Sequence, residues 1–305
     1  MGKNEMVEAA RPVLLDGGDG VRLLALHSAQ PEGTARAAVL LIHGWEGSSD
    51  STYIQRTGRI LYRQGYNVIR LNLRDHGASH HLNEGMFNGT LIEETATAVQ
   101  AAARLSSKLP FFVAGFSLGG NFALRIALDR NGASPDILRQ VIAVSPLIDP
   151  YRSTVLIDRL PLYRYYFLRK WKRSLRLKQK LFPHLYELDD LLSLDSTMEI
   201  TDRLIRRYTD FGDCRSYFSH YTLDEQTLQD LAVPATIIAA ADDPVIPVDD
   251  VAGVAGSELL RLSIQRWGGH CGFIESLTGR SWYEEVIIGI IQETTGELNP
   301  SAENL

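Results

Sequence analysis

The stretch of sequence that decides the fold is Pro110-Phe-Phe-Val-Ala-Gly-Phe-Ser-Leu-Gly-Gly120. Its first five residues, 110–114, form a short apolar run typical of a buried strand, and residues 118–129 have a helical pattern. Between them lies Gly-x-Ser-x-Gly, centred on Ser117. Such a serine must occupy a sharp, strained turn, and its neighbours two positions away must lack Cβ atoms so that strand and helix can approach. We predict that Ser117 is a nucleophile at a helix N-terminus, where the helix dipole favours developing negative charge.

The rest of the chain repeats this alternation of strand and helix. Five further short apolar runs, each bounded by turn residues, predict strands at 38–42, 66–73, 141–144, 235–241 and 259–264. Helical patterns occupy 52–64 and a segment that opens with a capping box at Thr90-Leu-Ile-Glu93 and runs to about Ser106. This spacing predicts a mostly parallel central sheet with helices on both faces. Near the start, 13–16 and 21–28 flank a pair of glycines and predict an antiparallel hairpin at the sheet edge.

The alternation stops between Asp149 and Leu231, where the chain is rich in Arg, Lys, Tyr and Leu and has helical periodicity. We therefore expect 149–230 to be a helical cap or lid, inserted into a core made of 1–148 and 231–305. A lid over Ser117 excludes water and shapes a substrate pocket. The apolar residues expected to line it are Leu162, Tyr163, Tyr166, Phe167, Leu168 and Trp171.

A basic, aromatic stretch lies within this insertion. It begins with Arg169-Lys-Trp-Lys-Arg173 and continues through Arg176, Lys178 and Lys180. One interpretation is transient contact of the lid with an anionic membrane surface. The other is a helix face exposed to solvent, which is the commoner origin of such stretches.

Two backbone N–H groups are expected to stabilise an oxyanion. Hydrolysis of an acyl bond places negative charge on the carbonyl oxygen, and donors must point at it. The residue after the nucleophile, Leu118, supplies one N–H group in this arrangement. The loop His43-Gly-Trp-Glu-Gly47, which follows a predicted strand, supplies the other, and we assign it to Trp45. We expect the His43 side chain to be structural.

The acid is expected in Asp242-Asp243-Pro244, which closes a predicted strand. The carboxyl ends of parallel strands are where sites collect in open α/β sheets. We prefer Asp243 because the strand must end before the acid and the proline then fixes the turn. Asp242 is the competing candidate, and Asp149 is a more distant one.

The base is expected to be His270, within Gly268-Gly-His-Cys-Gly272. Glycines around a histidine allow its loop to fold over the nucleophile. His270 would take the proton of the Ser117 hydroxyl and return it to the leaving group, while Asp243 holds the imidazole in the right tautomer.

The other histidines and the two cysteines are expected to be structural. His76 is interpreted as part of a network that braces its loop, and His80 and His81 lack metal-ligand spacing. Cys271 is interpreted as a small packed residue. Together with Cys214 it is one of only two cysteines, which fits a reducing compartment. We expect neither a metal nor a cofactor.

Composition excludes several other classes of protein. The 305 residues are 45% hydrophobic and 22% charged, with a formal net charge of -6, which is unfavourable for binding a nucleic acid backbone. The first twelve residues have no apolar segment of the secretory type, and no apolar run is long enough to span a bilayer. We expect a cytoplasmic protein that acts on a small-molecule ester.

The assembled motifs resemble the YheT-like branch of the α/β-hydrolase superfamily. The matching segments are 43–47, Asn72-Leu73-Arg74, 115–121, 242–244, 269–273 and the part of the insertion from Ile200 to Tyr217. The resemblance implies an α/β-hydrolase fold, a carboxylesterase or acylglycerol-lipase activity without a cofactor, and the second aspartate of 242–244 as the acid. One position departs from the branch: Asp75 stands where that branch usually has glycine.

The leading expectation is an esterase that acts on short- or medium-chain carboxylic esters through an acyl-enzyme. An acyltransferase or a small-peptide hydrolase could use the same three side chains. A binding protein that keeps the fold without turnover is the remaining alternative.

Overall fold

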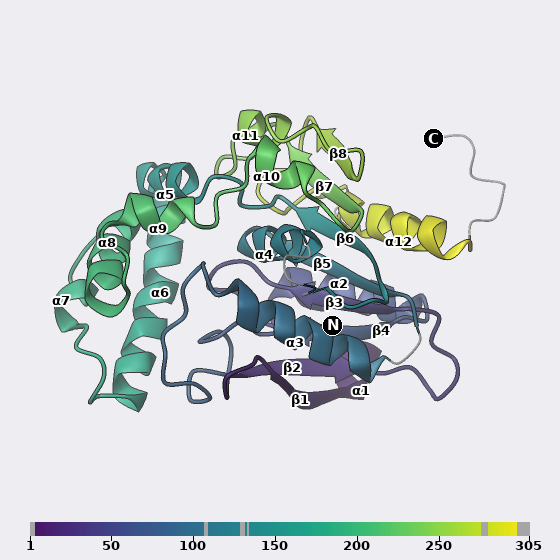
Figure 1. Ribbon diagram of the computed structural model, residues 1–305, viewed down its shortest axis with the longest axis horizontal. Helices are drawn as coiled ribbons and strands as arrows, with labels where there is room; N and C mark the ends of the chain where they lie inside the picture. The colour runs from purple at the N-terminus through teal and green to yellow at the C-terminus, as the bar shows by residue number, and fades with distance from the viewer. Residues whose placement is uncertain (1–3, 107–108, 129–131, 133, 276–279, 298–305) are drawn as a thin grey trace.

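The computed structural model describes residues 4–106, 109–128, 132, 134–275 and 280–297 (Figure 1). Its centre is one eight-stranded sheet in the order β1-β2-β4-β3-β5-β6-β7-β8. The strands are β1 Ala10–Asp16, β2 Arg22–Ser28, β3 Ala38–Ile42, β4 Asn67–Leu71, β5 Phe111–Phe116, β6 Leu138–Val144, β7 Ala235–Ala240 and β8 Leu260–Gln265. β2 runs antiparallel to both β1 and β4, and the remaining pairs are parallel. The six predicted strands and the predicted edge hairpin are thus confirmed.

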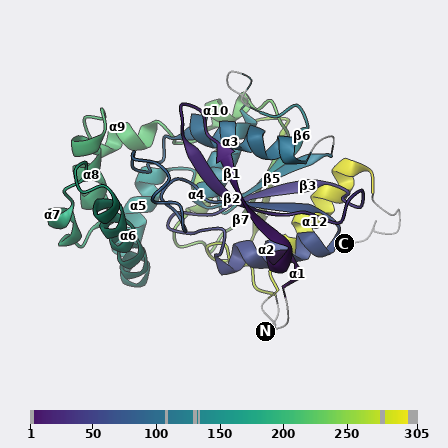
Figure 2. The same cartoon turned by 90° about the horizontal axis from the view of Figure 1, so that it is seen from below.

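Both faces of the sheet are covered by helices (Figure 2). One face packs against α1 Glu5–Ala9, α2 Thr52–Arg63 and α12 Trp282–Thr295, and the other against α3 Ile92–Leu105, α4 Leu118–Ala127 and α11 Val248–Ala252. Successive side chains of a strand point to opposite faces. In β3, Leu40 and Ile42 accordingly join the α3–α4 core while Val39 and Leu41 join the α2–α12 core. All five β3 residues are fully buried, as the continuous apolar run predicts.

Helices and loops, without a strand, make up the chain between β6 and β7. The helices are α5 Pro150–Arg159, α6 Pro161–Leu181, α7 Asp189–Leu192, α8 Thr197–Tyr208, α9 Cys214–Ser219 and α10 Glu225–Gln229. Of these, α6 to α9 lie beyond the carboxyl end of the sheet (Figure 1). Leu168 and Leu175 of α6 pack with Ile200 and Leu204 of α8 in a small hydrophobic core separate from those of the sheet. No helix in the described residues is long and apolar enough to cross a membrane.

The predicted capping box at Thr90–Glu93 is wrong. Helix α3 begins at Ile92, and Leu91 precedes it without a side-chain cap. The Thr90 hydroxyl, which a capping box would place at the helix N-terminus, instead donates a hydrogen bond to Asn88 Oδ1, 2.6 Å away in the preceding loop. The helix predicted over 118–129 ends at Ala127, and residue 129 lies outside the described residues.

Candidate active site

Ser117 lies on the turn between β5 and α4, with φ +52° and ψ −116°. Positive φ is strained for a residue with a Cβ atom. The glycines of the motif make this turn sterically possible. A Cβ atom on Gly115 would lie 2.1 Å from the Gly119 carbonyl oxygen, and one on Gly119 would lie 2.3 Å from that of Ile42. Gly-x-Ser-x-Gly is therefore the sequence that this close approach of strand and helix requires.

The structure brings Ser117, His270 and Asp243 together from the ends of three strands. His270 Nε2 lies 3.0 Å from Ser117 Oγ, and His270 Nδ1 lies 2.9 Å from Asp243 Oδ2. The other carboxylate oxygen of Asp243 accepts hydrogen bonds from the backbone N–H groups of Val245 and Ile246, at 2.8 and 3.0 Å. These bonds fix the buried carboxylate in a position where it orients the imidazole.

The two competing candidates for the acid, Asp242 and Asp149, accept hydrogen bonds from backbone N–H groups elsewhere. Asp242 Oδ1 accepts hydrogen bonds from the N–H groups of Gly268 and Gly269, both at 2.8 Å, and so fastens the loop that leads into His270. Asp149 precedes α5 and accepts a hydrogen bond from the Arg152 N–H group at 2.9 Å. Neither carboxylate contacts the imidazole ring, which pairs with Asp243.

The N–H groups of Trp45 and Leu118 have no hydrogen-bond acceptor among the residues that the structure describes. Leu118 is the first residue of α4, where backbone N–H groups lack intrahelical partners. Both residues line the same cavity as Ser117 and His270. Two unoccupied donors next to a strained serine are what stabilisation of an oxyanion needs.

The loop that carries Trp45 is held on both sides of that residue. The Gly44 N–H group donates to the Tyr53 hydroxyl at 2.8 Å, and the Glu46 N–H group donates to His76 Nε2 at 3.2 Å. A Cβ atom on Gly44 would lie 3.2 Å from the Ser117 Cβ atom, so glycine lets the loop approach the serine closely. The Trp45 N–H group is thus left free within an otherwise bonded loop.

His43 and His76 brace this loop as neutral imidazoles, in agreement with the structural roles expected for them. His43 Nδ1 lies 2.8 Å from the Gly44 carbonyl oxygen, and its Nε2 accepts from the Leu73 N–H group. His76 repeats the pattern, with Nδ1 2.7 Å from the Arg74 carbonyl oxygen. Burial lowers the pKa of His43 to about 4 and that of His76 well below its ordinary value. Both rings can therefore donate through one nitrogen and accept through the other near neutral pH.

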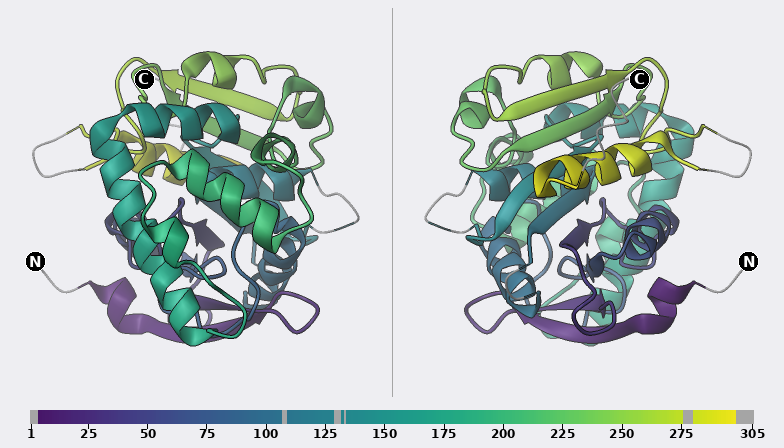
Figure 3. Two further views of the ribbon diagram at one scale, coloured as in Figure 1. Left: turned by 90° about the vertical axis from the view of Figure 1, so that its left-hand side faces the viewer. Right: turned by 90° about the vertical axis from the view of Figure 1, so that its right-hand side faces the viewer.

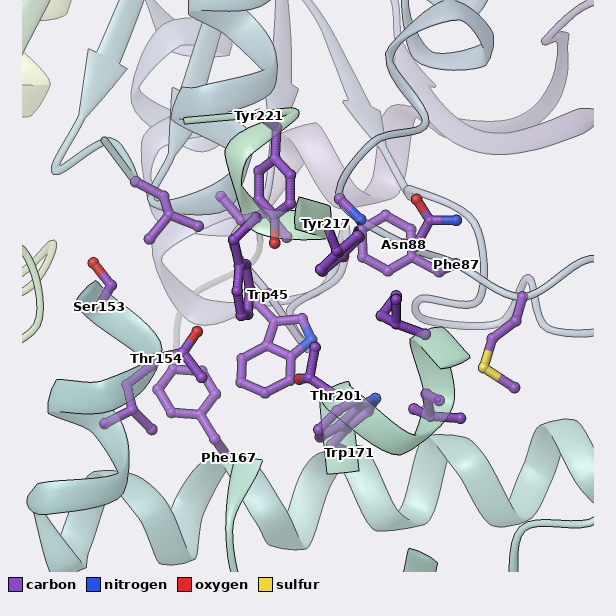
Figure 4. Close-up of a pocket in the computed structure, with 18 of the residues that line it drawn as sticks. Trp45, Phe87, Asn88, Ser153, Thr154, Phe167, Trp171, Thr201, Tyr217 and Tyr221 are labelled. Atoms are coloured by element: carbon purple, nitrogen blue, oxygen red, sulfur yellow. Dashed lines mark hydrogen bonds between the residues drawn. The ribbon is translucent and has the colours of Figure 1, made fainter. Parts of the chain in front are cut away.

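A cavity of about 270 Å³, with walls that are mostly apolar, has Ser117 in its lining. Among the aromatic side chains that line it are Trp45, Phe87, Phe167, Trp171, Tyr217 and Tyr221 (Figure 4). Its described lining contains no Asp, Glu, Lys or Arg. A cavity with this lining suits an uncharged, largely apolar group.

Four of the six side chains predicted to line the pocket do not line it. Phe167 and Trp171 do, whereas Leu162 is 84% exposed and Tyr166 is 51% exposed. Leu168 packs in the small core between α6 and α8, and Tyr163 packs against the larger core. The reason is helical phase. Residues four apart share a face, so Phe167 and Trp171 point inward together, whereas Leu162 and Tyr166 lie on the outward side. Tyr163 is four positions before Phe167 and shares its face, but it packs against the larger core instead of lining the cavity.

A buried ion pair that the sequence patterns do not reveal joins α6 to the loop below the cavity. Lys178 Nζ lies 2.8 Å from Asp75 Oδ1 and also donates to the carbonyl oxygens of Asn83 and Gly85. Asp75 has φ +56°, a backbone conformation that glycine adopts without strain. In this chain the aspartate supplies a carboxylate that anchors the helix.

The remaining candidate groups have structural contacts. Cys271 follows His270 and is half-buried, and desolvation raises the pKa of its thiol, which keeps it protonated. Its Sγ atom lies 3.8 Å from the Val144 carbonyl oxygen. His80 Nε2 lies 2.7 Å from the Ser174 hydroxyl. Among the described residues, no group of three or more His, Cys, Asp or Glu side chains could hold a metal ion.

Comparison with known families gives one match to most of the chain. The sequence model of the family described as "Serine aminopeptidase, S33" matches residues 33–261. Curated relatives are more distant. The chain is 22% identical to a monoacylglycerol lipase of Saccharomyces cerevisiae, over 89% of this chain and 63% of the lipase. It is 25% identical to a putative esterase, slr0264, of Synechocystis, over 86% of this chain and 76% of that protein. It is 20% identical to the phospholipase ABHD3 of mouse, over 82% of this chain and 61% of the phospholipase. The chain thus spans less than two thirds of the yeast lipase and of the mouse phospholipase.

Solved structures share the fold at low sequence identity. The esterase Pf2001 of Pyrococcus furiosus superposes with a TM-score of 0.62 at 16% identity, covering 94% of this chain and 91% of that one. The α/β-hydrolase GrgF of Penicillium superposes with a TM-score of 0.60 at 17% identity, covering 94% and 98%. The fold is therefore the α/β-hydrolase fold, as expected from the sequence.

Proposed function

Since the chain belongs to the serine aminopeptidase S33 family of α/β-hydrolases, we propose that it is a serine hydrolase that cleaves carboxylic esters through an acyl-enzyme on Ser117. The observation that carries the proposal is the pair of hydrogen bonds made by His270. One ring nitrogen lies 3.0 Å from Ser117 Oγ and the other lies 2.9 Å from Asp243 Oδ2. The Asp243 carboxylate accepts a hydrogen bond from the Nδ1–H group, which leaves Nε2 unprotonated and able to accept the serine proton.

The proposed reaction has two halves that use the same groups. Ser117 Oγ attacks the ester carbonyl as its proton passes to His270 Nε2, and Asp243 stabilises the imidazolium that forms. His270 then protonates the departing alcohol, leaving the acyl group on the serine. A water molecule then attacks the acyl carbonyl as its proton passes to His270. His270 returns that proton to Ser117 Oγ as the ester bond to the serine breaks, which releases the carboxylic acid and restores the free enzyme. The N–H groups of Trp45 and Leu118 donate to the carbonyl oxygen when it becomes an oxyanion. No step requires a metal or cofactor.

The cavity favours an ester over the substrate that the family description suggests. An aminopeptidase must bind a free, positively charged α-amino group, which is costly to bury unless a carboxylate pairs with it. The described lining supplies aromatic, aliphatic and uncharged polar side chains and no Asp or Glu. Its volume of about 270 Å³ lies near the lower end of ordinary ligand pockets, which supports a short- or medium-chain acyl group.

We further propose that residues 149–230 act as a lid on a core formed by 1–148 and 231–305. Phe167 and Trp171 from α6, with Tyr217 from α9, contribute to the cavity wall beside Ser117, which supports this division. A wall built by the insertion would exclude water and shape the acyl site. The assignment to the YheT-like branch belongs to the same proposal and rests on the motifs quoted from the sequence.

The test is hydrolysis of nitrophenyl esters of increasing acyl length by the wild type and by Ser117→Ala. We expect turnover that is highest for short or medium acyl chains and lost in the variant. Aminoacyl nitroanilides should be poor substrates by comparison. Faster cleavage of the anilides would favour a peptidase, and product trapped by an added alcohol in preference to water would favour an acyltransferase. A wild type as inactive as the variant, and unlabelled by a fluorophosphonate, would favour a binding protein.

A further inference from the structure

Helix α6 presents two chemically different faces. Phe167 and Trp171 point inward and line the cavity, while one stripe of side chains points away from the protein. The left panel of Figure 3 shows α6 running along the outside of the molecule. We call this stripe the outer face of α6, and it consists of Leu162, Tyr165, Tyr166, Arg169, Arg173 and Arg176, all of them exposed. Successive members are mostly three or four positions apart, which places them on one side of a helix.

The outer face combines apolar and cationic groups in two adjacent zones. At the start of the helix, Leu162 is 84% exposed and Tyr165 is 67% exposed, which is unusual for large apolar side chains. Three arginines follow them along the same stripe. The 21 residues of α6 contain eight Lys or Arg and no Asp or Glu, although the whole chain carries a net charge of -6. Positive charge is therefore concentrated on this helix.

The arginines of the outer face are available to a partner. Within the described residues, α6 makes its ion pairs through two lysines, Lys172 with Asp195 and Lys178 with Asp75. Neither pair involves Arg169, Arg173 or Arg176. Tyr166 does pack against Phe167 and Lys170, but no ion pair within the described residues neutralises the three arginines of the stripe.

We propose that the outer face of α6 is a docking surface for an anionic lipid bilayer. Arginines attract acidic headgroups, and Leu and Tyr side chains at the same level enter the interface between headgroups and acyl chains. A nucleic acid would pair with the arginines but would leave Leu162 exposed to water. A second copy of the chain, related by a twofold axis, would bring like charges together. The bilayer is the one occupant that uses both zones.

Docking would place the membrane close to the cavity. The helix is about 10 Å across, and its opposite face lines the cavity next to Ser117. A lipid-derived substrate would thus travel a distance comparable to the diameter of α6 between the bilayer and the cavity. Docking itself does not depend on the catalytic role of Ser117, so binding and hydrolysis can fail independently.

The experiment is co-sedimentation of the full chain with vesicles of phosphatidylglycerol and phosphatidylcholine, compared with vesicles of phosphatidylcholine alone. We expect binding to the anionic vesicles only, weakened by added salt. The triple variant Arg169→Gln/Arg173→Gln/Arg176→Gln should lose about fivefold in partition coefficient for each charge removed. Leu162→Ser/Tyr165→Ser should also weaken binding, and this loss should persist at high salt.

A matched control removes three positive charges from exposed positions of the core, as Arg11→Gln/Arg22→Gln/Arg104→Gln. This variant should bind like the wild type. Equal losses in the two triple variants, or no binding of the wild type to anionic vesicles, would overturn the proposal. So would binding of duplex nucleic acid through the outer face without binding of vesicles. The thermal unfolding midpoint of each variant, followed by circular dichroism, reports that it is folded whether or not it hydrolyses an ester.

Discussion

The indole ring of Trp45 stacks on the phenyl ring of Phe167, with 5.1 Å between the ring centroids and 15° between the ring planes. Trp171 meets the same indole edge-on at 5.0 Å, and Lys170 Nζ donates to the Glu46 carbonyl oxygen at 3.2 Å. Helix α6 therefore packs against, and hydrogen-bonds to, the loop whose Trp45 N–H group we propose as an oxyanion donor. The insertion thus contacts the loop that carries the proposed oxyanion donor, in addition to contributing to the cavity wall.

We expect Phe167→Ala to lower kcat for an acetyl ester about threefold to tenfold, because a stacked aromatic pair contributes about 0.5–1.5 kcal/mol to holding the loop. The acetyl group is too short to depend on the acyl cavity, so KM should change little. Steady-state kinetics measure kcat and KM separately. Leu168→Ala is the control, since the neighbouring side chain packs between α6 and α8. An effect on KM alone would show that Phe167 serves only as pocket lining.

The two adjacent aspartates should respond very differently to removal of charge. Asp243→Asn should lower kcat by about 10⁴, because the amide no longer holds the imidazole in the required tautomer. Asp242→Asn keeps an oxygen that can accept from the Gly268 and Gly269 N–H groups, so its loss should be slight. Hydrolysis of a nitrophenyl ester by both variants gives the comparison. Equal losses would refute the assignment of Asp243.

The Lys178–Asp75 pair should contribute far more to stability than an exposed pair does. Lys178→Met leaves the Asp75 carboxylate buried without its cation, which should lower the free energy of unfolding by about 3–5 kcal/mol. Arg207→Met breaks a pair whose partners, Arg207 and Asp190, are both exposed, and should cost less than about 1 kcal/mol. Urea denaturation of both variants measures the difference. A loss of similar size in the two would mean that the buried pair is not the anchor of α6.

Burial of His43 should make stability depend on pH. Its folded-state pKa of about 4 lies below the ordinary value of 6.5, so between these values the unfolded chain binds the proton more readily. The stabilisation that the folded state gains from holding His43 neutral is fully present above about pH 6.5 and is lost as the pH falls towards 4. In His43→Gln, whose amide can also donate and accept, the free energy of unfolding should fall less steeply between pH 6.5 and 4.5. If the free energy of unfolding changed with pH in the same way in wild type and variant, His43 would not be the buried neutral group that we expect.

The sheet and the nucleophile turn could be predicted because their causes are local. A continuous apolar run identifies β3, and the steric contacts of Gly115 and Gly119 leave few alternatives at Ser117. Capping patterns were less reliable. The Thr90 pattern failed because its hydroxyl bonds to Asn88, whereas α12, which was not predicted, does begin with a capping box between Ser281 and Glu284.

The inner wall of the cavity could not be predicted because α6 carries apolar residues around most of its circumference near the start. Its pattern does not say which face points inward, and only the contacts of Phe167 and Trp171 with Trp45 decide it. The pair between Lys178 and Asp75 joins residues 103 positions apart. Nothing in the spacing of either residue indicates such a partner.

The most direct test of the central claim is detection of the acyl-enzyme. The wild type is mixed with a nitrophenyl ester, quenched in acid within the first turnover, digested and analysed by mass spectrometry. We predict that the added acyl mass lies on the peptide containing Ser117 and is absent from Ser117→Ala. Hydrolysis that proceeds while Ser117 stays unmodified, or an acyl group found on another residue, would contradict the account.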